Sequence, residues 1–237
     1  MQDLAILTNA PFILLTETHL NPDILDAELQ IKNYSLYRSD RVGRSHGGVC
    51  IYVRNDLAAS VILKDSNSYC DSLTLRIHQL NLILVNIYRP PACKKELFNQ
   101  TIESVRNIIK NIEEYDQAAP SILIFGDFNF PDISWKHGSG SFRSSNQSSN
   151  VGEERSQAQT LLNFSEEFFL DQIIKSPTRN NNILDLIFTN DHQIINDYSI
   201  ICNNQLSDHY IIKFGLNQGC KNMGTAAPVV LRKVLDL

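Results

Sequence analysis

Apolar residues are grouped mainly in short runs along the chain, and each run predicts a buried β-strand. Such runs cover residues 12–15, 82–88 and 122–125. Residues 72–78 instead alternate apolar with polar side chains, which is the pattern of a half-exposed strand. Further strands are expected at residues 34–39, 49–54, 171–175, 183–188, 194–202 and 210–216.

Two segments have helical periodicity instead. Residues 94–115 place Ile102, Val105 and Ile109 on one face of a helix, and residues 158–169 repeat the same spacing. Residues 21–30 fit a short helix or a loop, and residues 138–150 are rich in Ser, Gly and Asn, which favours a loop. Few helices separate the strands, so we expect antiparallel sheets with helices outside them.

Composition is that of an ordinary globular protein and bounds its class. The 237 residues are 43% hydrophobic and 20% charged, which is enough for a sizeable core. We expect one domain over residues 1–217 and a linker or the start of a following region over residues 218–237. The net charge of −5 argues against a broadly basic protein that coats nucleic acid, but a nuclease with basic groups on one face remains compatible.

Targeting signals and cysteine motifs are not visible in the sequence. No apolar run is long enough for a membrane helix, and no secretory signal pattern opens the chain. The five cysteines are scattered without a CxxC pair, so neither a zinc site nor a disulfide framework is predicted. A reducing intracellular compartment fits this usage.

The chain is organised around the stretch from residue 121 to residue 131. Its apolar run stops at Gly126, and Asp127 and Asn129 follow. Side chains two apart in an extended chain point to the same side, so Phe128 and Phe130 would point the other way, into the core. A carboxylate and a carboxamide can together handle a proton, a cation, a water or a phosphate oxygen. A simple turn is the alternative.

Polar groups also stand at the ends of other predicted strands: Glu17, Tyr88, Asp185, Asp208 and His209. Polar side chains beside buried strands cost free energy unless they are satisfied, and one shared site would satisfy them. Structural alternatives exist for each. Glu17 could begin a helix, Tyr88 could be a core aromatic, and Asp185 could be a structural acceptor. Asp208 and His209 could form a surface turn.

Five motifs occur along the chain in an order that resembles the endonuclease/exonuclease/phosphatase family. They are Leu15-Thr-Glu-Thr-His19, Val85-Asn-Ile-Tyr-Arg-Pro90, Gly126-Asp-Phe-Asn129, Ile183-Leu-Asp-Leu-Ile-Phe188 and Ser207-Asp-His209. Within the family, the chain looks most like the apurinic/apyrimidinic-type endonuclease domain of non-LTR (LINE-type) retrotransposons. The segment Pro177-Thr-Arg179 and the ending Ser207-Asp-His209 favour that subgroup.

The resemblance implies an α/β (α+β) fold of the DNase I-like kind, a four-layer sandwich of two mainly antiparallel sheets flanked by helices. It implies hydrolysis of phosphoester bonds with Mg²⁺, or with Mn²⁺ as an alternative. Retrotransposon members nick target duplex DNA and leave a 3′-hydroxyl that primes reverse transcription. The implied partners are therefore DNA and, in a full-length element, a reverse transcriptase region. No membrane partner is expected, whereas access to the nucleus is expected.

The resemblance also assigns roles that make physical sense. Glu17 would hold the cation, a hard ion that takes carboxylate oxygen, and Asp208 would help with metal or charge balance. Asp127 would orient and deprotonate the attacking water, and Asn129 would position that water or a phosphate oxygen.

Three further residues complete the implied substrate site, together with Asp185. His209 would contact the phosphate as a donor, and Asp185 would pair with His209 and favour its charged form. Tyr88 would donate to a phosphate oxygen. Thr178 is a further candidate for a contact on the phosphate side.

The family pattern is not matched at the start of the chain. The family begins with a strand that ends in an Asn on the phosphate or metal, and the surroundings of Asn9 do not form such a strand. We therefore expect that this first strand is missing, that one sheet edge is left unpaired, and that one phosphate ligand is lost. An inactive relic, and a phosphatase or phospholipase of the same family, are the alternative functions.

Overall fold

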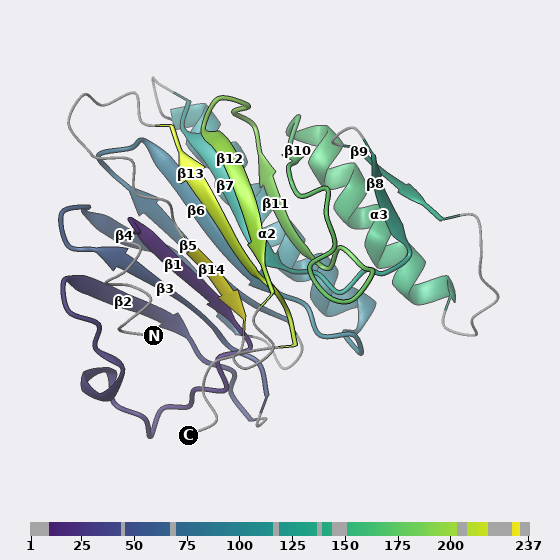
Figure 1. Ribbon diagram of the computed structural model, residues 1–237. Helices are drawn as coiled ribbons and strands as arrows, with labels where there is room; N and C mark the ends of the chain where they lie inside the picture. The colour runs from purple at the N-terminus through teal and green to yellow at the C-terminus, as the bar shows by residue number, and fades with distance from the viewer. Residues whose placement is uncertain are drawn as a thin grey trace.

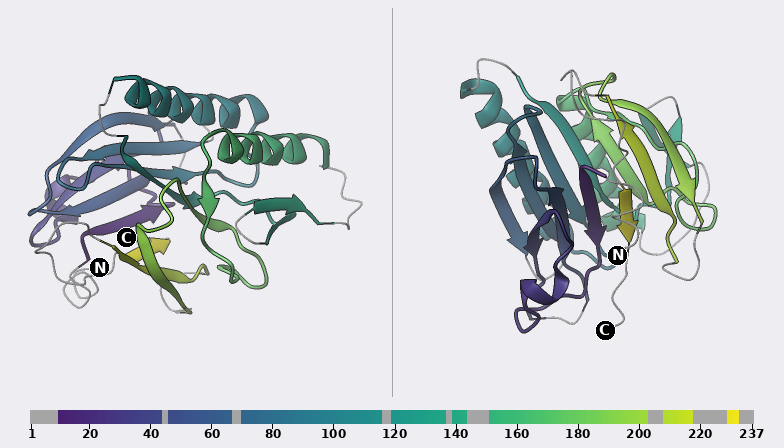
Figure 2. Two further views of the ribbon diagram at one scale, coloured as in Figure 1. Left: turned by 90° about the horizontal axis from the view of Figure 1, so that it is seen from above. Right: turned by 60° about the vertical axis from the view of Figure 1, so that its left-hand side comes forward.

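The protein is described by a computed structural model that covers residues 10–43, 46–66, 70–115, 119–136, 139–143, 151–202, 208–217 and 229–232. Over these residues, two six-stranded sheets lie face to face, and two α-helices cover the outer face of one of them (Figures 1 and 2). This arrangement confirms the predicted α/β sandwich.

Sheet A has the strand order β12 (Ile195–Ile201), β13 (Ile211–Leu216), β14 (Val229–Arg232), β1 (Phe12–Thr16), β3 (Val49–Arg54) and β2 (Tyr34–Ser39). Sheet B has the order β10 (Asp171–Gln172), β11 (Asp185–Thr189), β7 (Ser121–Asp127), β6 (Leu82–Tyr88), β5 (Asp71–Ile77) and β4 (Ala59–Ser66). The other elements are the hairpin β8 (Ile133–Lys136) and β9 (Ser139–Phe142), the helices α2 (Lys95–Tyr115) and α3 (Val151–Glu167), and the 3-10 helix η1 (Asp26–Leu29).

Neighbouring strands are mostly antiparallel, as the short connections predict. The two exceptions are the pairs β6–β7 and β1–β14, which are parallel. A parallel pair needs a crossover connection, and helix α2 supplies it between β6 and β7. Because of this crossover, the C-terminal ends of β6 and β7 lie side by side at one end of sheet B. This end of the sheet carries the candidate site.

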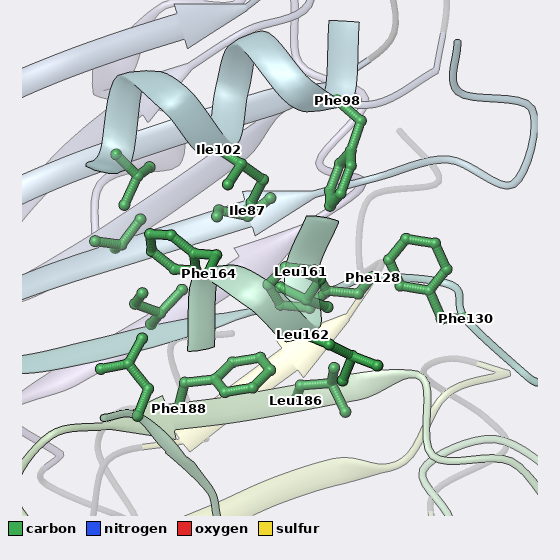
Figure 3. Close-up of a cluster of buried hydrophobic side chains, with 14 of the residues drawn as sticks. Ile87, Phe98, Ile102, Phe128, Phe130, Leu161, Leu162, Phe164, Leu186 and Phe188 are labelled. Carbon is green, nitrogen blue, oxygen red and sulfur yellow. The ribbon is translucent and has the colours of Figure 1, made fainter. Parts of the chain in front are cut away.

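Apolar side chains form one core between the sheets and another under the helices. The core between the sheets includes Phe12 and Leu14 of β1 and Phe125 of β7. The second core packs α2 and α3 against sheet B, and Figure 3 shows its aromatic residues, Phe128 and Phe130 among them. The prediction that these two phenylalanines turn into the core is confirmed. A third, smaller cluster lies on the other face of sheet A and includes residues beside η1.

Strand β14 overturns the expectation of an unpaired sheet edge. It pairs in parallel with β1, from Ile13 opposite Val229 to Thr16 opposite Arg232, and antiparallel with β13. Since β3 occupies the other side, β1 has a neighbour on both sides. Residues 229–232 of the predicted tail thus form part of sheet A, whereas Asn9 lies outside the described residues.

Other differences have local causes. Strand β7 runs to Asp127, two residues beyond the predicted end, because Gly126 permits a close approach of the backbone: an added Cβ would lie 2.0 Å from the carbonyl oxygen of Ile87. Strand β9 lies in the predicted loop 138–150, of which residues 138 and 144–150 are outside the description. Among the described residues, no helix is long and apolar enough to cross a membrane.

Candidate active site

Four side chains lie side by side at the end of sheet B where β6 and β7 terminate, because of the strand register. Asp71 lies opposite Tyr88, Tyr88 opposite Asp127, and Asp127 opposite Asp185. Directly opposed residues share one face of a sheet, and Tyr88 belongs to the core between the sheets. The whole row therefore faces sheet A, at the point where the apolar core ends.

Asp127 and Asp185 of this row form a buried cluster with His209. Their exposed fractions are 0%, 6% and 1%, and one ligand atom from each lies within 4.8 Å of the others. His209 is brought from sheet A, where it comes two residues before β13, and its Nδ1 lies 2.6 Å from Oδ2 of Asp185. With the carboxylate as acceptor, Nδ1 carries the proton, which fixes the ring and assigns any substrate contact to Nε2.

Asn129 is held on Asp127 by the turn that follows β7. Its backbone is left-handed, with φ of 51°, a conformation that Asn tolerates better than most residues. The Nδ2 amide donates to Oδ2 of Asp127 at 2.6 Å and to the carbonyl of Arg89 at 2.8 Å. The backbone N–H also donates to Oδ1 of Asp127 at 3.2 Å. The predicted carboxylate–carboxamide pair is thus a single hydrogen-bonded unit.

Glu17 reaches the row from sheet A through Tyr88. It follows the last residue of β1, its φ is 51°, and it is partly exposed. The Tyr88 hydroxyl donates to Oε1 of Glu17, so two residues predicted for the site meet across the two sheets. Glu17 is not one of the three residues of the Asp127 cluster.

Thr178 and Asp208 were also predicted for the site, but their contacts differ from those of the other predicted residues. Thr178 is fully buried, and its hydroxyl oxygen accepts the N–H groups of Leu184 and Asp185, each at 3.0 Å. It therefore positions the start of β11. The Asp208 side chain is 55% exposed and forms an ion pair with Arg179 at 2.5 Å.

Arg41 and Asp71 extend the site, and the sequence reasoning missed both. The two side chains form a buried ion pair, in which Nε of Arg41 donates to Asp71 at 3.2 Å, and the guanidinium lies 5.3 Å from the Tyr88 ring centroid. Burial raises the pKa of Asp71, and Arg41 opposes that rise. A charged residue directly before a predicted strand was the available signal for Asp71.

Two adjacent glycines shape the chain beside Glu17. Gly48 has φ of 84°, and an added Cβ would lie 2.6 Å from the Thr18 hydroxyl oxygen. Gly47 has φ of 114°, and its Cβ would lie 2.3 Å from Cζ of Arg41. The carbonyl of Gly48 accepts the Thr18 N–H at 3.2 Å. The absence of side chains here lets the Glu17 segment and Arg41 approach each other.

The donor set fits a hard divalent cation. Asp127 and Asp185 are buried carboxylates on directly opposed positions, and two like charges so placed repel unless a proton or cation offsets them. Carboxylate oxygens are the ligands that Mg²⁺ prefers. The partly exposed carboxylate of Glu17 is a second place where such an ion could be held, as the sequence predicts.

Comparison with known proteins places this geometry in a family. The model of one protein family, described as endonuclease-reverse transcriptase, matches residues 82–213. This range includes Tyr88, Asp127, Asn129, Asp185 and His209. A search of curated proteins finds no match.

Several solved structures share the fold. The endonuclease domain of TRAS1, a telomere-specific non-LTR retrotransposon, superposes with a TM-score of 0.61 at 15% identity over 92% of this chain and 91% of that one. The catalytic domain of Xenopus laevis APE2 gives 0.65 at 16% identity, over 96% and 89%. The AP endonuclease LMAP from Leishmania major gives 0.66 at 12% identity, over 92% and 81%. The predicted DNase I-like sandwich is confirmed by these likenesses.

Proposed function

The chain belongs to the endonuclease-reverse transcriptase family, and on that premise we propose that it is a divalent-cation-dependent endonuclease that nicks DNA. The observation that carries the proposal is the buried cluster of Asp127, Asp185 and His209, with Asn129 bonded to Asp127. Burying these polar groups costs free energy, so a protein without a function for them has no reason to keep them. The presence of all four residues therefore favours an active enzyme over a relic.

Asp127 is the general base in this proposal. A water placed beside its carboxylate gives up a proton as its oxygen attacks phosphorus, and the phosphodiester bond to the 3′ oxygen breaks. The Asn129 amide holds the carboxylate at 2.6 Å, so Asp127 presents a fixed oxygen to that water. The leaving 3′ oxygen takes up a proton from solvent water, and the products are a 5′-phosphate and a 3′-hydroxyl.

His209 and Tyr88 act on the phosphate. Asp185 fixes the His209 ring through the 2.6 Å contact, and with both ring nitrogens protonated Nε2 donates to a non-bridging oxygen as charge develops there. The Tyr88 hydroxyl, next to Asp127 in the row, donates its single proton to Glu17 in this structure. It would turn from Glu17 to a phosphate oxygen to act as the second donor on this side. Thr178 contributes by holding the backbone of Asp185.

A divalent cation, Mg²⁺ by preference, would neutralise charge on the phosphate and on the leaving oxygen. We place it on Glu17, and in this proposal Asp208 contributes negative charge to the site. In a full-length element, the 3′-hydroxyl would prime target-primed reverse transcription by the reverse transcriptase region. The TRAS1 endonuclease domain comes from a retrotransposon, which supports this context.

The test is nicking of supercoiled plasmid DNA by the purified chain, with Mg²⁺ and with EDTA. We expect metal-dependent nicking that falls by about 10³-fold in Asp127→Asn, because general base catalysis is worth about 10²–10⁴-fold. An inositol phosphate and sphingomyelin are offered in parallel. No nicking by the folded chain, or a preference for either of these substrates, would overturn the proposal.

A further inference from the structure

We propose that Arg89 is a positioning residue, whose buried side chain holds the segment from Asp127 to Asn129 in its working geometry. The inference rests on the proposed function and adds a residue to its machinery. Arg89 follows Tyr88 directly at the end of β6, but it belongs to the opposite side of sheet B, under the helices.

The main chain of Arg89 binds the segment at both ends. Its N–H donates to the carbonyl of Asp127 at 2.9 Å, and its carbonyl accepts Nδ2 of Asn129 at 2.8 Å. The first bond continues the pairing of β6 with β7 for one step past the last strand residues, and the second comes from the Asn129 side chain. Both use the main chain of Arg89. They depend on the backbone and would survive most substitutions of the side chain.

The guanidinium adds side-chain contacts to the same segment. Nη1 donates to two successive carbonyls, those of Phe128 at 3.1 Å and Asn129 at 3.0 Å. The guanidinium carbon lies 4.1 Å from the ring centroid of Phe130, which Figure 3 shows beside Phe128. The chain leaves the strand here with Asn129 in a left-handed conformation, so its carbonyls have no ladder partners. Arg89 satisfies them.

A buried cation is a costly way to fill this space. Arg89 is fully buried, and within the described part of the chain it forms no ion pair with a carboxylate. Burial lowers the pKa of the guanidinium, and the charge of Glu154 opposes this. An apolar side chain of similar volume would avoid the desolvation cost. One guanidinium binds the two carbonyls through Nη1 and Gln157 through Nε, and this spread of donors over one planar group is the property that only Arg brings.

Helix α3 fixes the guanidinium from behind. Nε of Arg89 donates to Oε1 of Gln157 at 2.7 Å, and Nε2 of Gln157 donates to the carbonyl of Cys93 at 2.7 Å. Gln157 is 1% exposed, so it has little freedom to move. A chain of hydrogen bonds thus runs from α3 through Arg89 to Asn129 and Asp127.

The test compares Arg89→Met, Arg89→Lys and Gln157→Met in the nicking assay, at a temperature where circular dichroism shows each variant folded. We expect Arg89→Met to lower kcat by about 10²-fold with KM changed less than about threefold, because small displacements of reacting groups have effects of this size. Arg89→Lys should be intermediate. Gln157→Met, which leaves Nη1 in place, should cost about three- to tenfold.

Arg106→Met is the matched control. Arg106 also lies near a ring, 5.9 Å from Phe164, and donates to Glu167 at 2.7 Å, but it makes no contact with the site. It should lose stability without losing kcat. Wild-type kcat in a folded Arg89→Met overturns the proposal. If that variant does not fold, wild-type kcat in both Arg89→Lys and Gln157→Met overturns it.

A wild-type chain that nicks nothing would refute the proposed function and still leave the positioning role testable. The readout is then the side-chain amide signal of Asn129 in NMR spectra, assigned with Asn129→Asp. We expect Arg89→Lys and Gln157→Met to move this signal toward its unfolded-chain position, and Arg106→Met to leave it in place. An unmoved signal in both variants contradicts the proposal.

Discussion

The two sheets supply the candidate site in different ways. Sheet B gives Tyr88, Asp127 and Asp185 from neighbouring strands in direct register, so ladder hydrogen bonds set their spacing. Sheet A gives Glu17 from the residue after β1 and His209 from two residues before β13. These two are placed by packing across the sandwich and by side-chain bonds to sheet B, which include the bond of Tyr88 with Glu17 and that of His209 with Asp185.

This difference indicates where the site is robust and where it can be changed. Hydrogen bonds hold neighbouring strands of the sheet about 4.8 Å apart. Residues that are placed by strand register therefore move only if the sheet itself moves. Residues contributed from the facing sheet must span about 10 Å between layers. Their positions depend on the strands that separate them. Strand β14 lies between β1 and β13, and it therefore sets the distance between Glu17 and His209.

The sharpest test of the comparison uses two adjacent residues of sheet A. His209→Ala should lower nicking by about 10³-fold, because it removes the donor held in the buried cluster. Asp208→Asn should lower nicking about tenfold or less, since its exposed carboxylate, paired with Arg179, acts on the site only through its charge. Single-turnover nicking rates measure both. Equal losses of nicking rate in the two variants would show that membership of the buried cluster does not determine the contribution of a residue to nicking.

The contact between Glu17 and Tyr88 gives the next effect. Tyr88→Phe removes the hydroxyl that donates to Glu17 and should raise the Mg²⁺ concentration for half-maximal nicking about tenfold, which is typical for loss of a ligand's supporting hydrogen bond. Glu17→Gln should raise it further, because it removes the proposed ligand itself. Titration of nicking against Mg²⁺ measures both shifts. A Tyr88→Phe curve that matches wild type contradicts the link between the sheets.

The smallest expected effect on activity comes from strand β14. Val230→Pro removes a backbone donor between β1 and β13 and should lower the free energy of unfolding by about 1–3 kcal/mol. Nicking should fall a few-fold, through Glu17 and His209. Thermal melting and the nicking rate measure the two effects. Ile62→Pro, at the register shift of edge strand β4, is the control and should change little.

Much of the fold could be predicted from the local pattern. The strands at 34–39, 49–54 and 82–88 agree with the prediction residue for residue. For the last two, the apolar runs leave little ambiguity, whereas residues 34–39 are mostly polar and only partly buried. Edge strand β4 was not predicted, since none of its residues is buried and its pattern lacks alternation. Helix α3 begins at Val151, seven residues earlier than residue 158, because its first turns are polar and carry no apolar signal.

The candidate site divides along the same line. Asp127 and Asn129 could be linked from their spacing alone, because two residues apart on one chain is a local relation. Arg41, Asp71 and Arg89 could not, since each acts on a residue far along the sequence. In the sequence, these charged residues cannot be distinguished from ordinary surface residues, because only the fold shows that they are buried.

The sequence by itself determined which strands are buried, which polar groups close them, and which family the motifs resemble, because these follow from short-range pattern. Tertiary structure alone decided the rest. It set Asp127 opposite Asp185 through strand register and brought His209 across the sandwich. It also inserted β14 beside β1 and buried Arg89 behind Asn129. These contacts join residues distant in sequence, and the free energy that selects them comes from packing the whole core.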